Sequence, residues 1–244
     1  MLYDDKAPDV LKKYGVRAFP TFIVTDADGK EEMRQVGAPF STPADAIKWF
    51  EKVGDAFVNL PKYEAAYEKS ADDHDNAIKL ADAYAALGKA DKAMPIYEKL
   101  AEKLPKDDKR RVDVQLAYAQ ALIGTATREN QAEVGAKIQK IYDDVLPGLV
   151  KAKDERALEP GILNARLKSG IGKDHDGARK DLKALIEAFP ETSRMNELMY
   201  WAAAIAQQAG DNDAAKAEFQ ALIKRGPAED DYVKAAQRSL DRMK

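Results

Sequence analysis

The feature that most restricts how this chain can fold is an apolar pattern between residues 76 and 107, NAIKLADAYAALGKADKAMPIYEKLAEKLPKD. Small and bulky apolar residues recur in it at helical spacing on both sides of Gly88. Ala81 and Ala93 leave room for two helices to cross closely. The bulky apolar and proline positions are Leu80, Tyr84, Tyr97, Leu100 and Pro105. This spacing predicts two antiparallel helices joined by a short turn.

Looser copies of the pattern follow at about residues 159–192 and 196–228. Residues 109–153 predict a longer helical pair joined by the segment GTATREN, and residues 231–243 predict an amphipathic helix that covers the last apolar face. The spacing resembles that of the tetratricopeptide (TPR) repeat family. The resemblance implies a mainly α fold, a TPR-like solenoid of helical hairpins preceded by a small N-terminal α/β segment.

That α/β segment is predicted from local signals in the first sixty residues. Residues 7–14 favour a short helix, and the aromatic and β-branched run at 22–24 favours a buried strand. An Asp-Gly turn then leads into a second strand at 31–36. Thr42 and Pro43 predict the start of a helix. The apolar face of that helix is expected to hold Ile47, Phe50, Val53 and Phe57.

The motif YGVRAFPTF, followed by DGK, resembles the second half of a thioredoxin-like domain. The resemblance implies that Pro20 corresponds to the cis-proline of that family. The half that would carry a Cys-x-x-Cys pair has no counterpart here. We therefore expect residues 1–59 to form a partial thioredoxin-like segment and residues 60–244 to form the repeat array. The partial segment is either the product of a truncated gene or a degenerate half kept as an N-terminal cap.

The sequence contains no cysteine, which excludes a disulfide, a thiolate nucleophile and a cysteine-ligated metal within this chain. No Ser/His/Asp arrangement and no phosphate-binding glycine loop stands out either. Asp-rich surroundings of His74 and His175 could suggest metal ligation, but aspartates at such positions favour helix caps. We therefore predict no enzyme activity, no metal and no cofactor.

Charge and hydropathy restrict the partners. Lys and Arg number 39 against 42 Asp and Glu, a net charge of -3 with both signs interspersed, so no nucleic-acid binding is expected. No apolar run reaches the length of about 18 residues that spans a bilayer, so no membrane association is expected. The N-terminus does not resemble a signal peptide. The default expectation is a cytoplasmic protein, or a periplasmic or exported one if an upstream signal is missing.

In TPR proteins the first helices of the hairpins line a concave face on which peptides dock, and the resemblance places candidate binding residues there. They are Ile78, Asp82, Leu163, Leu167, Tyr200 and Gln207. These positions are mostly apolar or acidic, so a clamp for a C-terminal carboxylate is disfavoured. An edge of the predicted strand hairpin could also pair with a second copy in a homodimer.

These features lead to two functional hypotheses. The first is a non-catalytic scaffold that binds a partner protein or peptide through the concave face of the array. The alternative is a C-terminal fragment of a thioredoxin-like thiol–disulfide oxidoreductase or chaperone, whose catalytic half is missing from this chain.

Overall fold

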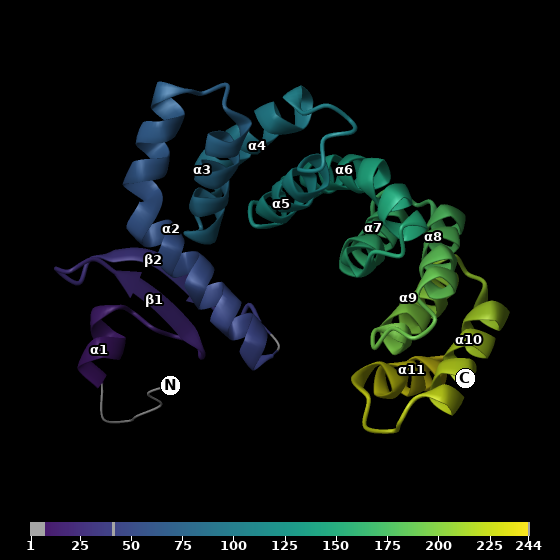
Figure 1. The fold of residues 1–244 in the computed structure, drawn as a ribbon. Coiled ribbons are helices and arrows are strands. Elements are labelled where there is room, and N and C mark those ends of the chain that lie inside the picture. The colour runs from purple at the N-terminus through teal and green to yellow at the C-terminus, as the bar shows by residue number, and fades with distance from the viewer. Residues whose placement is uncertain (1–7, 41, 244) are drawn as a thin grey trace. The chain divides into compact units, whose positions relative to one another are not determined.

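The computed structural model describes residues 8–40 and 42–243. A small two-stranded sheet is followed by helices arranged mostly as hairpins, as Figure 1 shows. The mainly α fold with a small N-terminal α/β segment is confirmed. Contacts divide the chain into two compact units, unit 1 (Met1–Ala121) and unit 2 (Leu122–Lys244). The predicted division after residue 59 stays a prediction.

The N-terminal sheet is a hairpin of β1 (Thr21–Thr25) and β2 (Glu31–Val36), preceded by helix α1 (Pro8–Lys13). The carboxylate of Asp26 accepts hydrogen bonds from the backbone N–H groups of Asp28 and Lys30, at 3.0 and 2.8 Å. Gly29 has a φ of +76°, which a residue with a side chain rarely adopts. The predicted strand–turn–strand is therefore confirmed.

Helix α2 (Pro43–Lys69) begins where the sequence predicted, with Thr42 Oγ1 accepting from the Asp45 N–H at 3.2 Å. It then runs without a break through Pro61. A proline inside a helix removes one backbone hydrogen bond. Here α2 packs along α3, and those contacts hold both halves of α2 in helical form.

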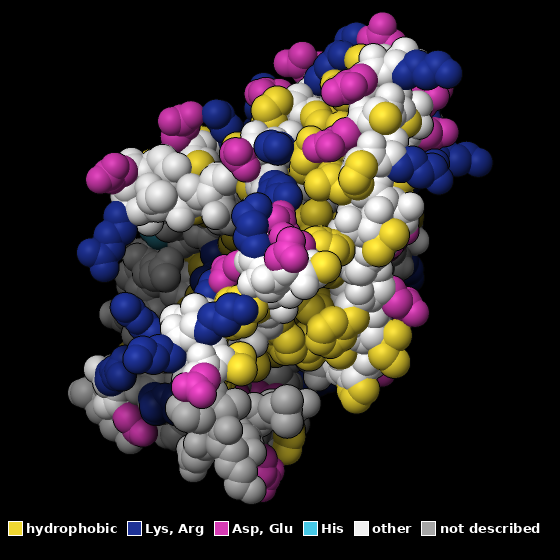
Figure 2. Space-filling view, turned by 90° about the vertical axis from the view of Figure 1, so that its left-hand side faces the viewer, with side chains coloured by type: hydrophobic (Ala, Val, Ile, Leu, Met, Phe, Trp, Pro, Cys, Tyr) yellow, Lys and Arg dark blue, Asp and Glu magenta, His cyan; other side chains and the backbone are white. Residues whose placement is uncertain are grey.

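The apolar face predicted for α2 is only partly buried. Val53 is buried and joins Met33 of β2 and Leu87 in one apolar cluster, so the hairpin packs on the helices. Ile47 and Phe50 are 60% and 51% exposed, which the predicted face did not anticipate. Figure 2 shows hydrophobic side chains gathered in a strip on the side of the molecule where α2 and the hairpin lie.

The first predicted helical hairpin is confirmed as α3 (His74–Ala86) and α4 (Ala90–Lys103). The residues that define its pattern are buried: Leu80, Ala81, Tyr84, Ala93, Tyr97 and Leu100. Gly88 lies in the turn between the helices with a φ of +69°. The next helix, α5 (Arg111–Ile123), ends just before the predicted connecting segment GTATREN.

Unit 2 continues the helical hairpins. Its elements are α6 (Gln131–Lys151), the 3-10 turn η1 (Glu155–Ala157), α7 (Leu158–Gly170), α8 (His175–Ala188), α9 (Met195–Gln208), α10 (Asn212–Arg225) and α11 (Asp231–Arg242). Val233 and Ala236 of α11 are buried against Phe219 and Leu222 of α10, so α11 caps the array as predicted. Among the described residues, no helix is both long and apolar enough to cross a bilayer.

Candidate functional site

Two hollows flank helix α3 in unit 1. The larger, with a volume of about 310 Å³, lies between α3 and the start of α5, and the smaller, of about 190 Å³, lies between α3 and α2. Both hollows are lined by Lys79 and Asp82 of α3. The two hollows adjoin at these residues, and together they are here called the α3 groove. Its lining is Lys52, Asp55, Ala56, Tyr63, Asp75, Ile78, Lys79, Asp82, Ala83, Arg110, Asp113 and Val114.

The face of α3 that forms the groove follows from helical periodicity. Asp75, Lys79 and Asp82 are spaced by four and three residues, which places them on one side of the helix. Asp73 fixes where this face begins, because its Oδ1 accepts from the N–H groups of Asp75 and Asn76 at 2.9 and 3.2 Å. The opposite side of α3 carries the buried Leu80 and faces the core.

Asp82 is held in place by a tyrosine from the second helix of the hairpin. The fully buried Tyr97 donates its hydroxyl proton to Asp82 Oδ1 at 2.5 Å. Burial, with the adjacent Asp82 carboxylate as a further cause, raises the pKa of Tyr97. The tyrosine therefore stays protonated and remains a donor, which orients the carboxylate at the centre of the groove.

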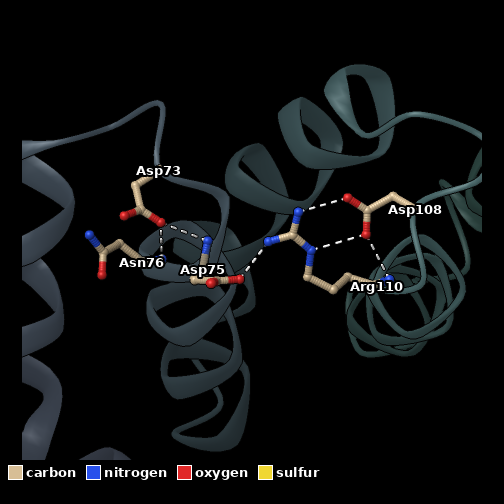
Figure 3. Close-up of polar contacts among 5 residues, drawn as sticks. All are labelled: Asp73, Asp75, Asn76, Asp108 and Arg110. Carbon is tan, nitrogen blue, oxygen red and sulfur yellow. Dashed lines mark hydrogen bonds and ion pairs between the residues drawn. The ribbon is translucent and has the colours of Figure 1, made fainter.

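Arg110, which lines the larger hollow, joins α3 to the loop before α5, as Figure 3 shows. Its Nη1 lies 2.5 Å from Asp75 Oδ1, and its Nε and Nη2 donate to the two oxygens of Asp108 at 3.0 and 2.7 Å. A guanidinium that meets one carboxylate through two parallel bonds is geometrically well defined. Hydrogen bonds from Arg110 lower the pKa of Asp108 to about 2.

This bridge predicts a specific acid sensitivity. The pKa of Asp108 is lower in the fold than its ordinary value of 3.8. The bridge therefore makes its full contribution to the stability of the fold above about pH 4, and this contribution is lost as the pH falls through about 2. We expect the melting temperature of Asp108→Asn to fall less than that of the wild type over this range. Asp107→Asn, next to it and exposed, is the control. Parallel acid curves for wild type and Asp108→Asn would contradict the role of the bridge.

Two of the predicted binding residues belong to unit 1. Ile78 and Asp82 both line the α3 groove. Leu163 and Leu167 lie half-buried on α7 of unit 2, where Leu167 approaches Gly135 of α6. The role of these four residues in binding stays a prediction.

The last two predicted binding residues lie half-buried on α9 of unit 2. The ring of Tyr200 packs against Phe219 and Tyr232 at centroid distances of 5.8 and 5.7 Å. Gln207 lies near the end of the same helix. Pro20, immediately before β1, follows a cis peptide bond after Phe19. The functions predicted for all three stay predictions.

Sequence reasoning missed most of the groove. Lys79 could have been found, because it lies on the same helical face as Ile78 and Asp82. Arg110 and Lys52 come from a loop and from a neighbouring helix, and no spacing in the sequence links them to α3. Lys79 forms no ion pair with any residue that the structure describes.

The histidines lie at helix starts, as the capping interpretation predicted. Asp73 precedes His74, and Asp174 precedes His175 while its Oδ1 accepts from the Gly177 N–H at 2.9 Å. Within residues 8–40 and 42–243, no three acidic, histidine or cysteine side chains group so as to hold a metal ion.

The fold and the groove define a helical-hairpin array of the TPR type. The family model of the tetratricopeptide repeat matches residues 75–107, which include most of α3 and all of α4, and residues 197–227, which include most of α9 and all of α10. The chain therefore contains TPR repeats at two of the predicted places. Comparison with curated proteins by sequence found no match.

Solved structures that are similar to this chain include three TPR or TPR-like proteins. Two are nearly identical TPR-like repeats of a candidate kinesin light chain from Podosopora anserina, each 16% identical with a TM-score of 0.52. The alignments cover 81% and 83% of this chain and 94% and 100% of those chains. A thermophilic TPR protein of Thermus thermophilus is 16% identical, with a TM-score of 0.44 and coverage of 81% and 96%. At this identity the first two show the fold alone.

Proposed function

We propose that this protein is a non-catalytic scaffold that binds an extended segment of a partner protein in the α3 groove. The observation that carries the proposal is the meeting of two hollows at Lys79 and Asp82, on the first helix of a TPR repeat. Adjoining hollows lined by three helices can contact several successive side chains of one peptide.

The lining indicates what kind of segment would fit. Ile78 and Val114 supply apolar surface in the larger hollow, where an apolar side chain could be buried. Around them lie four aspartates and three cations, so neither charge dominates. We therefore expect a partner segment that combines an apolar side chain with charged groups of both signs, an acidic one lying against Lys79.

Charge reversal of Lys79 tests this proposal. Peptides selected from a random display library against the wild-type chain are expected to bind Lys79→Glu at least about tenfold more weakly, since an acidic side chain would then meet a like charge. Fluorescence polarisation with the labelled peptides measures the Kd. Lys180→Glu, an exposed lysine on α8 of unit 2, is the matched control and should leave the Kd unchanged.

Two results would count against the proposal. If the selected peptides bind Lys79→Glu as tightly as the wild type, the α3 groove is not their site. If no peptide is enriched, the scaffold function itself loses its support. Circular dichroism of each variant verifies that the helices are intact.

A further inference from the structure

A second cavity lies in unit 2, on helices that the proposed function does not use. It has a volume of about 310 Å³ and lies among α6, α7 and α8. One part of its lining is apolar, formed by Leu146, Pro147 and Val150 of α6 and Leu185 of α8. The size is at the lower end of the range of small-ligand pockets, about 300–1,000 Å³.

The polar part of the lining includes a buried asparagine with an unsatisfied oxygen. Asn164 of α7 is 1% exposed, and its Nδ2 donates to Asp143 Oδ1 at 3.0 Å. Its Oδ1 is buried and accepts no hydrogen bond from any residue that the structure describes. A buried carbonyl oxygen without a hydrogen-bond donor is energetically unfavourable, so a ligand that donates to this oxygen would be stabilised.

Comparison with the first repeat shows that packing alone does not require this asparagine. In α7, Asn164 precedes the fully buried Ala165, and in α3 Leu80 precedes the fully buried Ala81. Both residues lie in the first helix of a hairpin and both are buried. The residue before the buried alanine in α3 is thus a leucine without any polar group, whereas α7 places an amide there.

The charged groups beside Asn164 leave further acceptors open. Lys168 of α7 lies between two carboxylates, with its Nζ 3.0 Å from Asp143 Oδ1 and 2.7 Å from Asp181 Oδ2. Across the described chain, no hydrogen bond engages Asp143 Oδ2 or Asp181 Oδ1. Lys151, the other cation of the lining, is exposed and forms none of these contacts. One half-buried ammonium thus faces two carboxylates, an excess of one negative charge.

Lys168 keeps its own charge in this setting. Burial lowers its pKa, but the hydrogen bonds and charges of Asp181 and Asp143 outweigh burial and hold the pKa above its ordinary value. The arrangement around it therefore offers acceptors and negative charge, and the ligand must supply donors and positive charge.

We propose that this cavity binds a primary alkylammonium group, with the ammonium donating to Asn164 Oδ1 and the two aspartates and the alkyl chain lying against the apolar lining. Either the side chain of a lysine in a partner protein or a free alkylamine supplies this chemistry. The site is independent of the α3 groove, so the two proposals succeed or fail separately.

The test is an NMR titration of the ¹⁵N-labelled full chain with n-pentylamine at neutral pH. The side-chain amide of Asn164 and the backbone amide of Gly161, which also lines the cavity, report binding. We expect saturable shifts with n-pentylamine and none with pentanoate or pentanol. Comparing Nα-acetyl-lysine methylamide with cadaverine distinguishes a lysine side chain from a free amine by the tighter Kd.

Two variants are expected to change the affinity for n-pentylamine in opposite directions. Asn164→Leu, which copies Leu80 of the first repeat, is expected to weaken pentylamine binding at least about tenfold, reported by Gly161. Lys168→Met removes the competing ammonium and is expected to tighten it several-fold. Lys183→Met, an exposed lysine on α8 outside this lining, is the control.

The proposal is overturned by any of three results: no saturable shift with pentylamine, equal binding of pentanoate, or weaker amine binding by Lys168→Met. The last result does not depend on whether Asn164→Leu folds. It would mean that Lys168 itself is the group that holds the ligand.

Discussion

Replacing Phe219 with alanine is expected to lower the free energy of unfolding of unit 2 by about 3–5 kcal/mol. The ring is fully buried in the cluster that joins α9, α10 and α11, together with Ala203, Leu222 and Val233. Removing it leaves a cavity that three rigid helices can close only in part. The capping helix α11 loses a main contact surface, so the loss of stability should extend to the end of the array.

The two tryptophans of the sequence make this measurement specific. Trp49 lies in unit 1 and Trp201 in unit 2, so in a Trp49→Phe background the fluorescence of Trp201 reports unit 2 alone. Guanidinium unfolding then measures the change. Phe219→Leu keeps most of the volume and is expected to cost less than about 1.5 kcal/mol. Equal losses for alanine and leucine would contradict the cavity argument.

This cluster also bears on the predicted role of Tyr200. Its ring packs against Phe219 and Tyr232, so Tyr200→Ala would remove core contacts as well as any partner contact. Loss of binding in that variant is informative only if its unfolding curve matches the wild type.

The second large effect is expected at Tyr97. Tyr97→Phe should lower the free energy of unfolding of unit 1 by about 1.5–3 kcal/mol, because it removes a hydrogen bond to a charged acceptor. The hydroxyl is buried and donates to Asp82 at 2.5 Å. The fluorescence of Trp49 in a Trp201→Phe background reports this unit.

A double-mutant cycle with Asp82→Ala isolates the interaction itself. We expect the double variant to lose less than the sum of the two single losses. Tyr63→Phe is the matched control, since its hydroxyl donates to Asp55 at an exposed position and should change the stability by no more than about 0.5 kcal/mol. Additive losses for Tyr97 and Asp82 would show that the short contact does not stabilise the fold.

The same pair links stability to the proposed function. With its phenolic donor removed, Asp82 is free to change its side-chain rotamer at the centre of the α3 groove. Peptides that bind the wild type should therefore bind Tyr97→Phe more weakly even under conditions in which the variant is fully folded.

Features that depend on near neighbours in the chain could be predicted from the sequence. The alanine, aromatic and proline spacing of 76–107 located α3 and α4, and the Asp-Gly turn located the hairpin of β1 and β2. Caps at Thr42 and Asp73 were equally local, since each side chain bonds to a backbone N–H two or three residues further on. Such contacts form whatever the rest of the chain does.

Features that depend on packing between helices and strands could not be predicted from the sequence. A proline is unfavourable inside a helix, yet α2 runs continuously through Pro61 while it packs on α3. Ile47 and Phe50 matched the apolar period of a buried face, yet both stay more than half exposed, although Phe22 of β1 packs on the ring of Phe50. Periodicity shows which residues share a face and does not show what covers that face.

The candidate sites likewise contain features that the sequence predicts and features that only the structure shows. By itself the sequence determined that this chain forms TPR-type hairpins, that it lacks thiol chemistry and that Ile78 and Asp82 share a helical face. Only the tertiary structure decided that Arg110 bridges Asp75 and Asp108, and that Asn164 lies buried beside Lys168 and two carboxylates. These groups lie far apart in the chain and meet because packed helices bring them together, at distances that no local pattern encodes.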